Sequence, residues 1–184
     1  MELITLKNKD NVKLIKDVIM HPYKVNKDPS GVLVETLRRD WGDIYNKGRE
    51  FFMQYYSETP SDVARDEDVW HFHPTVQDDR FSVIKGAIVV AVADNRKDSE
   101  TFGLLNLFYI DARENPYIFL IPRRTLHRFL VVSKEPAILI NFPTGLYNPK
   151  EEERVSYKEA DIRLPNGTPF NWDLVRSYLQ KING

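Results

Sequence analysis

The sequence contains no cysteine, which excludes a disulfide framework, a thiolate metal site and a cysteine nucleophile. It also lacks an excess of charge of either sign: the net charge is −1, so the basic surface of a nucleic-acid-binding domain is not indicated. Long hydrophobic runs are missing, and the first residues, MELITLKNKD, are too charged for a signal peptide. We therefore expect a soluble, cytoplasmic protein with neither a nucleic-acid nor a membrane partner.

Short stretches of aromatic and β-branched residues dominate the middle of the chain. Turn-forming residues separate them, and the intervals are too short for the crossover helices that a parallel sheet needs. This spacing predicts a mainly β protein, an antiparallel sandwich or barrel with short terminal helices. We expect strands within residues 51–57, 69–73, 81–94, 103–110, 117–121, 128–132 and 137–142.

The length of the chain fits a single domain, 1–184, with its core at about 50–147. Residues 148–184 are expected to form a C-terminal extension that contains a helix. The charged stretch 148–161 is expected to be a solvated connector. The helix is expected at 171–184, with Asn171 as its cap, Gly184 past its end and an apolar stripe formed by Trp172, Val175, Leu179 and Ile182.

Three of the four histidines stand where they can meet. His71 and His73 are two residues apart, so on a strand their side chains point to the same face. His127 follows a turn that begins at Pro122 and leads into another expected strand. If the two strands are neighbours, the three imidazoles converge. Such a cluster suits metal ligands, a catalytic base with a neighbour, or polar residues on the wet face of a sheet, and the residues alone leave these alternatives open.

The order of these residues resembles the two motifs of the cupin superfamily. The matching residues are His71, His73, Asp79 and Gly86 in the first motif, and Pro122 and His127 in the second. The resemblance implies a cupin-type antiparallel jelly roll, also called a double-stranded β-helix. It also makes a divalent metal a candidate cofactor, with ligands His71, His73, His127 and either Asp79 or Gln77. Asp79 stands in for a glutamate that is usually closer to the second histidine, and Arg124 stands in for the glycine of the turn.

A longer stretch, DRFSVIKGAIVVAVADNRKDSETFG at residues 79–103, is similar to the central hairpin of the dTDP-4-dehydrorhamnose 3,5-epimerase family, in a divergent branch of it. Shorter matches extend over roughly residues 28–150. The resemblance implies an isomerase of polysaccharide biosynthesis that binds a nucleotide-linked 4-keto-6-deoxy sugar. It would abstract a proton beside the ketone, with no required cofactor, and would form a homodimer.

The same resemblance assigns roles to individual residues. His71 occupies the position of the catalytic base. The family's acid, a tyrosine, aligns near Ile140, so Tyr147 is assigned as the acid, with Tyr55 and Tyr56 as alternatives. The carboxylate that orients the base has no match, and Asp161 and Asp173 are merely carboxylates in that part of the sequence. The residues assigned to substrate binding are His73, His127, Arg80, Gln54 and Arg65.

Two other functions fit the same residues. One is a metal-dependent cupin enzyme built on the three histidines, and the other is a non-catalytic sugar-binding cupin that has lost the acid. The fold is common to all three, so the geometry of the site has to separate them. A metal site needs three imidazole nitrogens around one ion. An epimerase needs a carboxylate against the far nitrogen of His71 and a proton donor across the pocket.

Overall fold

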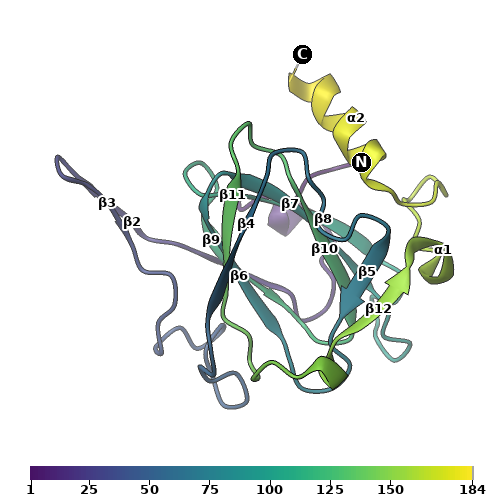
Figure 1. The fold of residues 1–184 in the computed structure, drawn as a ribbon, viewed down its shortest axis with the longest axis horizontal. Helices are drawn as coiled ribbons and strands as arrows, with labels where there is room; N and C mark the ends of the chain where they lie inside the picture. Colours follow the sequence, from purple (N-terminus) through teal and green to yellow (C-terminus); the bar gives the residue numbers. More distant parts are fainter. Residues whose placement is uncertain (184) are drawn as a thin grey trace.

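Two five-stranded antiparallel sheets face each other and form a jelly roll (Figure 1). The computed structural model describes residues 1–183. The first sheet contains, in spatial order, β1 (Ile19–Pro22), β9 (Tyr117–Ile121), β6 (Asp79–Lys85), β11 (Ala137–Asn141) and β4 (Tyr55–Thr59). The second contains β12 (Glu153–Ser156), β5 (Val69–Phe72), β10 (Thr125–Val131), β7 (Ala87–Asp94) and β8 (Leu105–Asp111). The predicted fold class, a mainly β cupin-type jelly roll, is confirmed.

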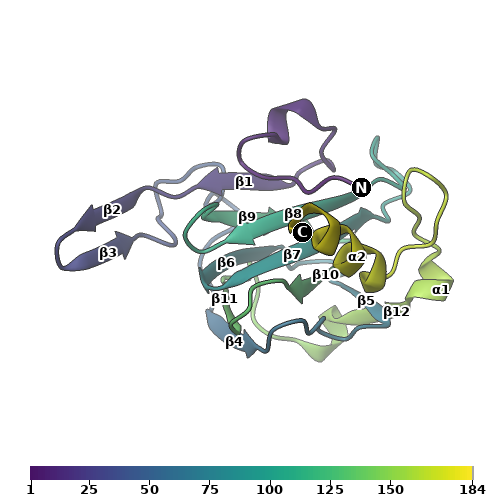
Figure 2. The ribbon, with the colours of Figure 1, turned by 90° about the horizontal axis from the view of Figure 1, so that it is seen from above.

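Every stretch that was expected to contain a strand does so. The longest, residues 81–94, holds most of β6 and all of β7, which a tight turn joins at Gly86. This residue has φ of 72°, and a Cβ there would lie 2.6 Å from Ser133 Oγ, so the turn requires glycine. The sequence analysis missed the edge strands β1 and β12 and a hairpin of β2 (Val25–Asp28) and β3 (Gly31–Val34). The hairpin projects from the barrel (Figure 2).

The main core lies between the two sheets, where alternate residues of each strand face inward. Phe81 and Val83 of β6 meet Val90 and Val92 of β7 in this core. β7 is buried along its whole length because its outer face, which includes Ala91, is covered as well. Apolar side chains therefore fill one end of the barrel interior. The polar side chains between the sheets lie at the other end.

The C-terminal extension supplies the cover of the second sheet. It contains α1 (Tyr157–Ala160) and α2 (Trp172–Asn183), and a 3₁₀ turn at Pro149–Glu151 precedes β12. Trp172 and Val175 of α2 are buried against this sheet and Leu179 is partly buried, as the predicted stripe requires, whereas Ile182 is 55% exposed. Asn171 Oδ1 accepts a hydrogen bond from the Leu174 N–H at 3.1 Å, which is the predicted cap. Gly184 lies outside the described residues. In residues 1–183, no helix combines the length and the hydrophobicity that crossing a membrane requires.

Candidate active site

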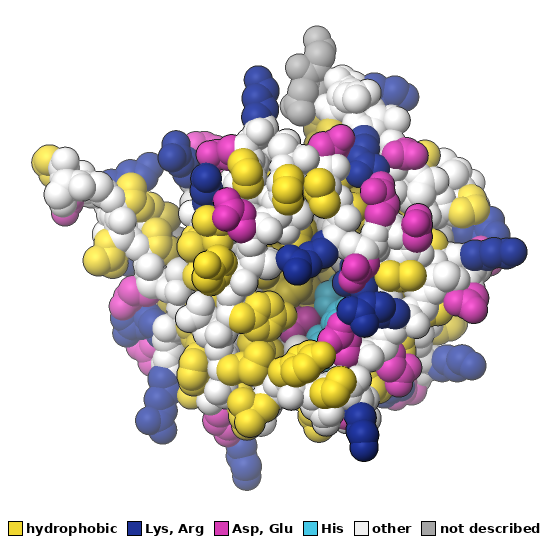
Figure 3. Space-filling view, in the orientation of Figure 1, with side chains coloured by type: hydrophobic (Ala, Val, Ile, Leu, Met, Phe, Trp, Pro, Cys, Tyr) yellow, Lys and Arg dark blue, Asp and Glu magenta, His cyan; other side chains and the backbone are white. Residues whose placement is uncertain are grey.

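A cavity of about 540 Å³ opens between the two sheets, toward the β4 and β12 edges. Figure 3 shows histidine at the bottom of this hollow, with hydrophobic side chains along one side of the mouth and charged ones along the other. The histidines come from β5 and β10 and the residue that follows β5, and the tyrosines of the mouth come from β4 and the loop after β11. The cavity thus combines an apolar approach with a polar floor, as small-molecule sites commonly do.

The structure places His71, His73 and His127 together on the floor of the cavity. β5 and β10 are neighbouring strands, and their register pairs His71 with His127. The Nε2 atoms of His71 and His73 lie 3.1 Å apart. Oδ2 of Asp79 lies 3.2 Å from Nε2 of His73 and 3.0 Å from Nε2 of His127. The cluster therefore consists of three imidazoles and one carboxylate, all of which were singled out from the sequence.

Asp79 is the centre of this cluster, and its side chain is only 3% exposed. Its Oδ1 accepts hydrogen bonds from Gln77 Nε2 and Asn141 Nδ2, each at 2.8 Å. Burial alone would raise the pKa of Asp79, but the positive charge and hydrogen bonds of His73 and His127 hold it well below its usual range. The carboxylate is therefore ionised at the bottom of the cavity.

The imidazole of His71 is neutral at neutral pH. Burial, together with the neighbouring His127 and His73, lowers the pKa of His71 to about 2. Burial also acts to lower the pKa of His73, but the carboxylate of Asp79 outweighs it and raises that pKa. His71 is therefore unprotonated at neutral pH and can accept a proton.

Backbone carbonyls hold the outer nitrogens of the other two histidines. His73 Nδ1 lies 2.8 Å from the carbonyl oxygen of Glu151, and His127 Nδ1 lies 3.2 Å from that of Thr125. A carbonyl oxygen can only accept a hydrogen bond, so we assign an N–H to each Nδ1. The Nε2 atoms of both rings are thereby directed at Asp79.

The outer nitrogen of His71 faces a carboxylate that the sequence analysis missed. His71 Nδ1 lies 3.5 Å from Oε1 of Glu152, an electrostatic contact rather than a formed hydrogen bond. Glu152 immediately precedes β12, whose Arg154 pairs in register with His71. Asp161 and Asp173 form ion pairs with Arg163 and Arg176 instead, and neither lines the cavity.

The expectation that residues 148–161 are a solvated connector is wrong for 153–156, which form β12. The only signal was Val155, a single β-branched residue among charged neighbours. Its side chain packs with Trp70 in the apolar cluster on the outer face of the second sheet. A four-residue edge strand needs little apolar surface, because pairing with β5 satisfies its backbone. Because residues 148–161 are highly charged, the sequence analysis did not predict a strand there, and it missed Glu151 and Glu152, which precede that strand.

Three tyrosines line the cavity, and they differ in how they are held. Tyr147 is 68% exposed at the rim, and Tyr56 is equally exposed. The Tyr55 hydroxyl accepts a hydrogen bond from Asn141 Nδ2 at 2.9 Å. Burial of its phenol, with the nearby charge of Asp79, raises the pKa of Tyr55 to about 12, so this hydroxyl stays protonated at neutral pH. Tyr55 is thus connected to the histidine cluster through one amide.

Ile140, the position at which the family tyrosine was aligned, does not line the cavity. Its side chain packs into the apolar cluster on the outer face of the first sheet, with Ile118 and Phe142. The neighbouring residues of β11, Leu139 and Asn141, are the ones that face inward, because side chains alternate along a strand.

Arg80 does not line the cavity, which corrects the prediction that it lies in the substrate pocket. Its side chain leaves the opposite face of β6 from Asp79, because consecutive residues of a strand point to opposite faces. The guanidinium is fully buried. It donates hydrogen bonds to the carbonyl oxygens of Phe142 at 2.6 Å, Arg49 at 2.7 Å, Glu50 at 3.0 Å and Ile44 at 3.3 Å. Arg80 therefore anchors residues 44–50 to the outside of the barrel.

The other two predicted substrate-binding residues have different positions. Arg65 lines the cavity with an exposed side chain. Gln54 is exposed and does not line it, although its neighbours Met53 and Tyr55 do. Of the two arginines predicted to bind substrate, Arg65 therefore lines the cavity and Arg80 does not.

Four of these side chains also have the geometry of a metal site. One ligand atom from each of His71, His73, His127 and Asp79 lies within 4.8 Å of all the others. An ion about 2.1 Å from each ligand keeps neighbouring ligand atoms about 3 Å apart, and the closest pairs here are separated by 3.0–3.2 Å. Three imidazoles and a carboxylate suit iron, manganese, nickel or zinc, so the residues present fit such an ion.

Comparisons with known proteins show which family the chain belongs to. A family model described as dTDP-4-dehydrorhamnose 3,5-epimerase matches residues 13–177. A probable low-salt glycan biosynthesis epimerase of Haloferax volcanii is 41% identical over 145 residues, which are 78% of this chain and 88% of that protein. A spore coat polysaccharide biosynthesis protein of Bacillus subtilis is 28% identical over 166 residues, 89% of this chain and 96% of that one.

Among solved structures, a dTDP sugar isomerase of Desulfovibrio desulfuricans superimposes with a TM-score of 0.72. The match covers 86% of this chain and 92% of that one at 21% identity, so it supports the fold alone. The family model and the relative of 41% identity define an enzyme of the isomerase class, and its fold is a jelly roll. The chain belongs to the dTDP-4-dehydrorhamnose 3,5-epimerase family and is a sugar-nucleotide epimerase.

Proposed function

We propose that this enzyme epimerises a nucleotide-linked 4-keto-6-deoxy sugar and that His71 is its base. The observation that carries the proposal is the environment of His71, a neutral imidazole in the cavity with the carboxylate of Glu152 behind its outer nitrogen. A neutral base backed by a carboxylate is what proton abstraction requires. His73, His127 and Arg65 line the same cavity and are proposed to contact the substrate.

The reaction uses the acidity of the carbons beside the ketone. His71 removes a proton from one of them, and electron density moves onto the ketone oxygen to give an enolate. Return of a proton from the opposite face inverts that carbon, so a second group must supply it. Glu152 stabilises the imidazolium while it exists, because its Oε1 lies on the Nδ1 side of the ring.

Tyr147 is proposed as the acid on the rim, and Tyr55 is the alternative that the hydrogen bond from Asn141 favours. Loss of the acid stops inversion but leaves removal of the proton intact. Replacement of the right tyrosine by phenylalanine should therefore reduce epimerisation more than exchange of the proton with solvent.

The function is tested by incubation with dTDP-4-keto-6-deoxyglucose in deuterated water. We expect deuterium at the carbons that flank the ketone, detected by mass spectrometry of the recovered sugar nucleotide. A protein that gives no incorporation above buffer, with this and other nucleotide-linked keto sugars, would be better explained as a non-catalytic sugar-binding cupin.

A metal-dependent cupin enzyme is the second candidate, because four ligand atoms converge within 4.8 Å. The two candidates compete for one atom: a metal ion on His71 Nε2 would occupy the lone pair that the base needs. No metal is required by the proposed reaction. The bound ion would instead supply Lewis-acid chemistry in the competing one.

We therefore expect chelator-treated protein to retain deuterium exchange and saturating Co²⁺ to inhibit it. Binding of Co²⁺ is followed independently by its visible absorption, which should be lost in His73→Asn. If chelation removes exchange and a stoichiometric ion restores it, the metal-dependent candidate replaces the first one.

We also propose a homodimer, supported by two exposed apolar surfaces. Val32 and Leu33, on the projecting hairpin, are 63% and 62% exposed (Figure 2). An isolated two-stranded hairpin is marginally stable, so a partner surface would hold it. Phe51 and Phe52, which precede the cavity-lining Met53 in sequence, are about half exposed and give such a hairpin an apolar surface to cover.

We expect a dimer in sedimentation velocity, and a shift to monomer when both hairpin residues are changed, Val32→Asp with Leu33→Asp. A wild-type protein that is monomeric at micromolar concentration would contradict this proposal. The cytoplasmic location stays a prediction from the sequence.

A further inference from the structure

A second hollow, of about 510 Å³, lies at the end of the barrel where β6 begins and β9 ends. Five cationic side chains line it, and two carboxylates oppose them. The cations are Lys47, Arg49, Arg96, Arg123 and Arg124, and the carboxylates are Asp17 and Asp78. The catalytic cavity is lined by none of these residues, so this is a separate place on the molecule.

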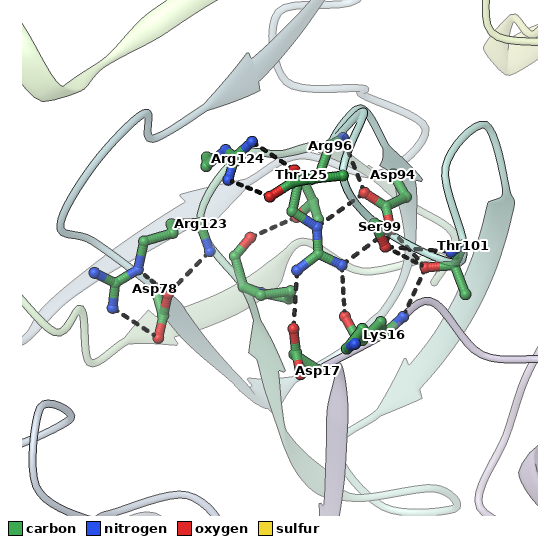
Figure 4. A network of polar contacts seen from close by, with 12 residues as sticks. Lys16, Asp17, Asp78, Asp94, Arg96, Ser99, Thr101, Arg123, Arg124 and Thr125 are labelled. Atoms are coloured by element: carbon green, nitrogen blue, oxygen red, sulfur yellow. Dashed lines mark hydrogen bonds and ion pairs between the residues drawn. The ribbon is translucent and has the colours of Figure 1, made fainter.

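All three side-chain nitrogens of Arg96 already donate hydrogen bonds to its own partners. It donates to both oxygens of Asp94, to Asp17 Oδ2 at 3.0 Å and to the Lys16 carbonyl oxygen at 2.7 Å. Figure 4 shows this guanidinium between Asp94 and Asp17, with Ser99 and Thr101 on the far side of Asp94. This part of the hollow is a closed structural network.

The other side of the hollow has more positive than negative charge. Asp78 is buried, and it accepts from Arg123 Nε at 2.8 Å and from Arg49 Nε at 3.1 Å. One carboxylate therefore serves two guanidiniums. Lys47 has no carboxylate within 4.0 Å among residues 1–183. Three cations face one anion, a local excess of two positive charges.

Some hydrogen-bond donors that line this second hollow have no partner within residues 1–183. Arg123 uses its terminal nitrogens on the Thr75 carbonyl oxygen and on Asp78. Arg49 donates only its Nε, and its two terminal nitrogens make no hydrogen bond within the described part of the chain. The Arg49 side chain is 23% exposed, so these nitrogens are open to a ligand in the hollow.

Arg124 brings a further charge at a conformational cost. Its φ is +65°, in the left-handed region that suits glycine and disfavours arginine. Its backbone N–H bonds to the His73 carbonyl oxygen at 2.8 Å, a bond that glycine would make equally well. Within residues 1–183, its side chain pairs only with Asp98, which is 71% exposed, and exposed pairs contribute little to stability. The fold therefore gains little from an arginine here, which points to a ligand.

We propose that this hollow binds a phosphate group through Lys47, Arg49 and Arg124. Guanidinium forks match the spacing of phosphate oxygens, and a phosphate dianion balances an excess of two positive charges. Free inorganic phosphate and the diphosphate of a nucleotide-linked sugar share this chemistry. The experiment distinguishes these two sources.

The test is calorimetric titration of the full chain with inorganic phosphate at low ionic strength. We expect binding to weaken at least ten-fold in Lys47→Gln and in Arg124→Gly. The glycine variant should melt no lower than the wild type, because it relieves the backbone conformation at that position. Lys158→Gln, on α1, removes the same charge from an exposed residue elsewhere and should leave binding unchanged.

A second arm uses Arg65→Gln, which removes a cation from the catalytic cavity. Phosphate binding that is lost in Arg65→Gln but kept in the two hollow variants would overturn the proposal, as would absence of binding to the wild type. If Lys47→Gln weakens phosphate binding and also binding of dTDP-4-keto-6-deoxyglucose, the diphosphate is the ligand. If it weakens phosphate binding alone, the site takes a separate anion.

Discussion

Replacement of His71 by asparagine should reduce deuterium exchange beside the ketone by about 10²–10⁴-fold, the usual contribution of a general base. Asparagine keeps a polar side chain of similar size but cannot accept the proton. The measurement is the initial rate of deuterium incorporation in equal amounts of folded enzyme. His21→Asn is the matched control, because His21 pairs with Asp43 away from the cavity. An exchange rate unchanged in His71→Asn would remove the base from the proposal.

The pH profile of exchange adds a second readout for the same residue. Since burial and the neighbouring histidines lower the pKa of His71 below the ordinary value of 6.5, the base stays unprotonated as the pH falls through 6.5. The rate should therefore persist at pH 6 and fall only in more acidic solution. Glu152→Gln removes the charge behind the ring, so it should slow exchange without abolishing it. A profile with an acid limb at pH 6.5 would show that another group is the base.

Replacement of Arg80 by methionine should destabilise the protein by about 3–5 kcal/mol, the range for breaking a buried charged network. The change leaves four backbone carbonyl oxygens without their buried donor, including those of Arg49 and Phe142. Urea unfolding at constant pH measures the loss. Arg113→Met, at an exposed arginine, should change the free energy of unfolding by less than about 0.5 kcal/mol.

The same variant separates the structural role of Arg80 from the role assigned to it by sequence. A residue that binds the sugar nucleotide would weaken substrate binding and leave stability unchanged when replaced. We expect the reverse: the Michaelis constant of folded Arg80→Met should stay near that of the wild type while its unfolding midpoint falls. Arg80→Lys should lose less stability, because an ammonium can still donate to some of the same carbonyls.

The central strands could be predicted because the residues that specify them are close together in the sequence. The run 81–94 combines β-branched residues with a glycine at the turn, and both the alternation and the turn appear in the sequence itself. The common face of His71 and His73 also followed, because residues two apart on a strand point the same way. These features depend on residues close together in the chain.

The missing parts depend on contacts that no local pattern records. Glu152 reaches His71 only because β12 pairs with β5, about 80 residues earlier in the sequence. The direction of Arg80 depends on register: a shift by one residue exchanges the cavity for the outer face, and Asp79 occupies the inner position. Alignment to a family motif gave residue types at about the right place but did not fix which face each one occupies.

β12 is the last of the strands in sequence order, which sets the order in which the barrel is completed during synthesis. A ribosome releases the strands from β1 to β11 before residues 151–156, so the histidines can come together before Glu152 emerges. Until then, the barrel would hold its imidazoles without the carboxylate behind His71. A nascent chain of this length would already resemble the enzyme in shape, and the carboxylate proposed to assist His71 would be added just before the last strand of the barrel.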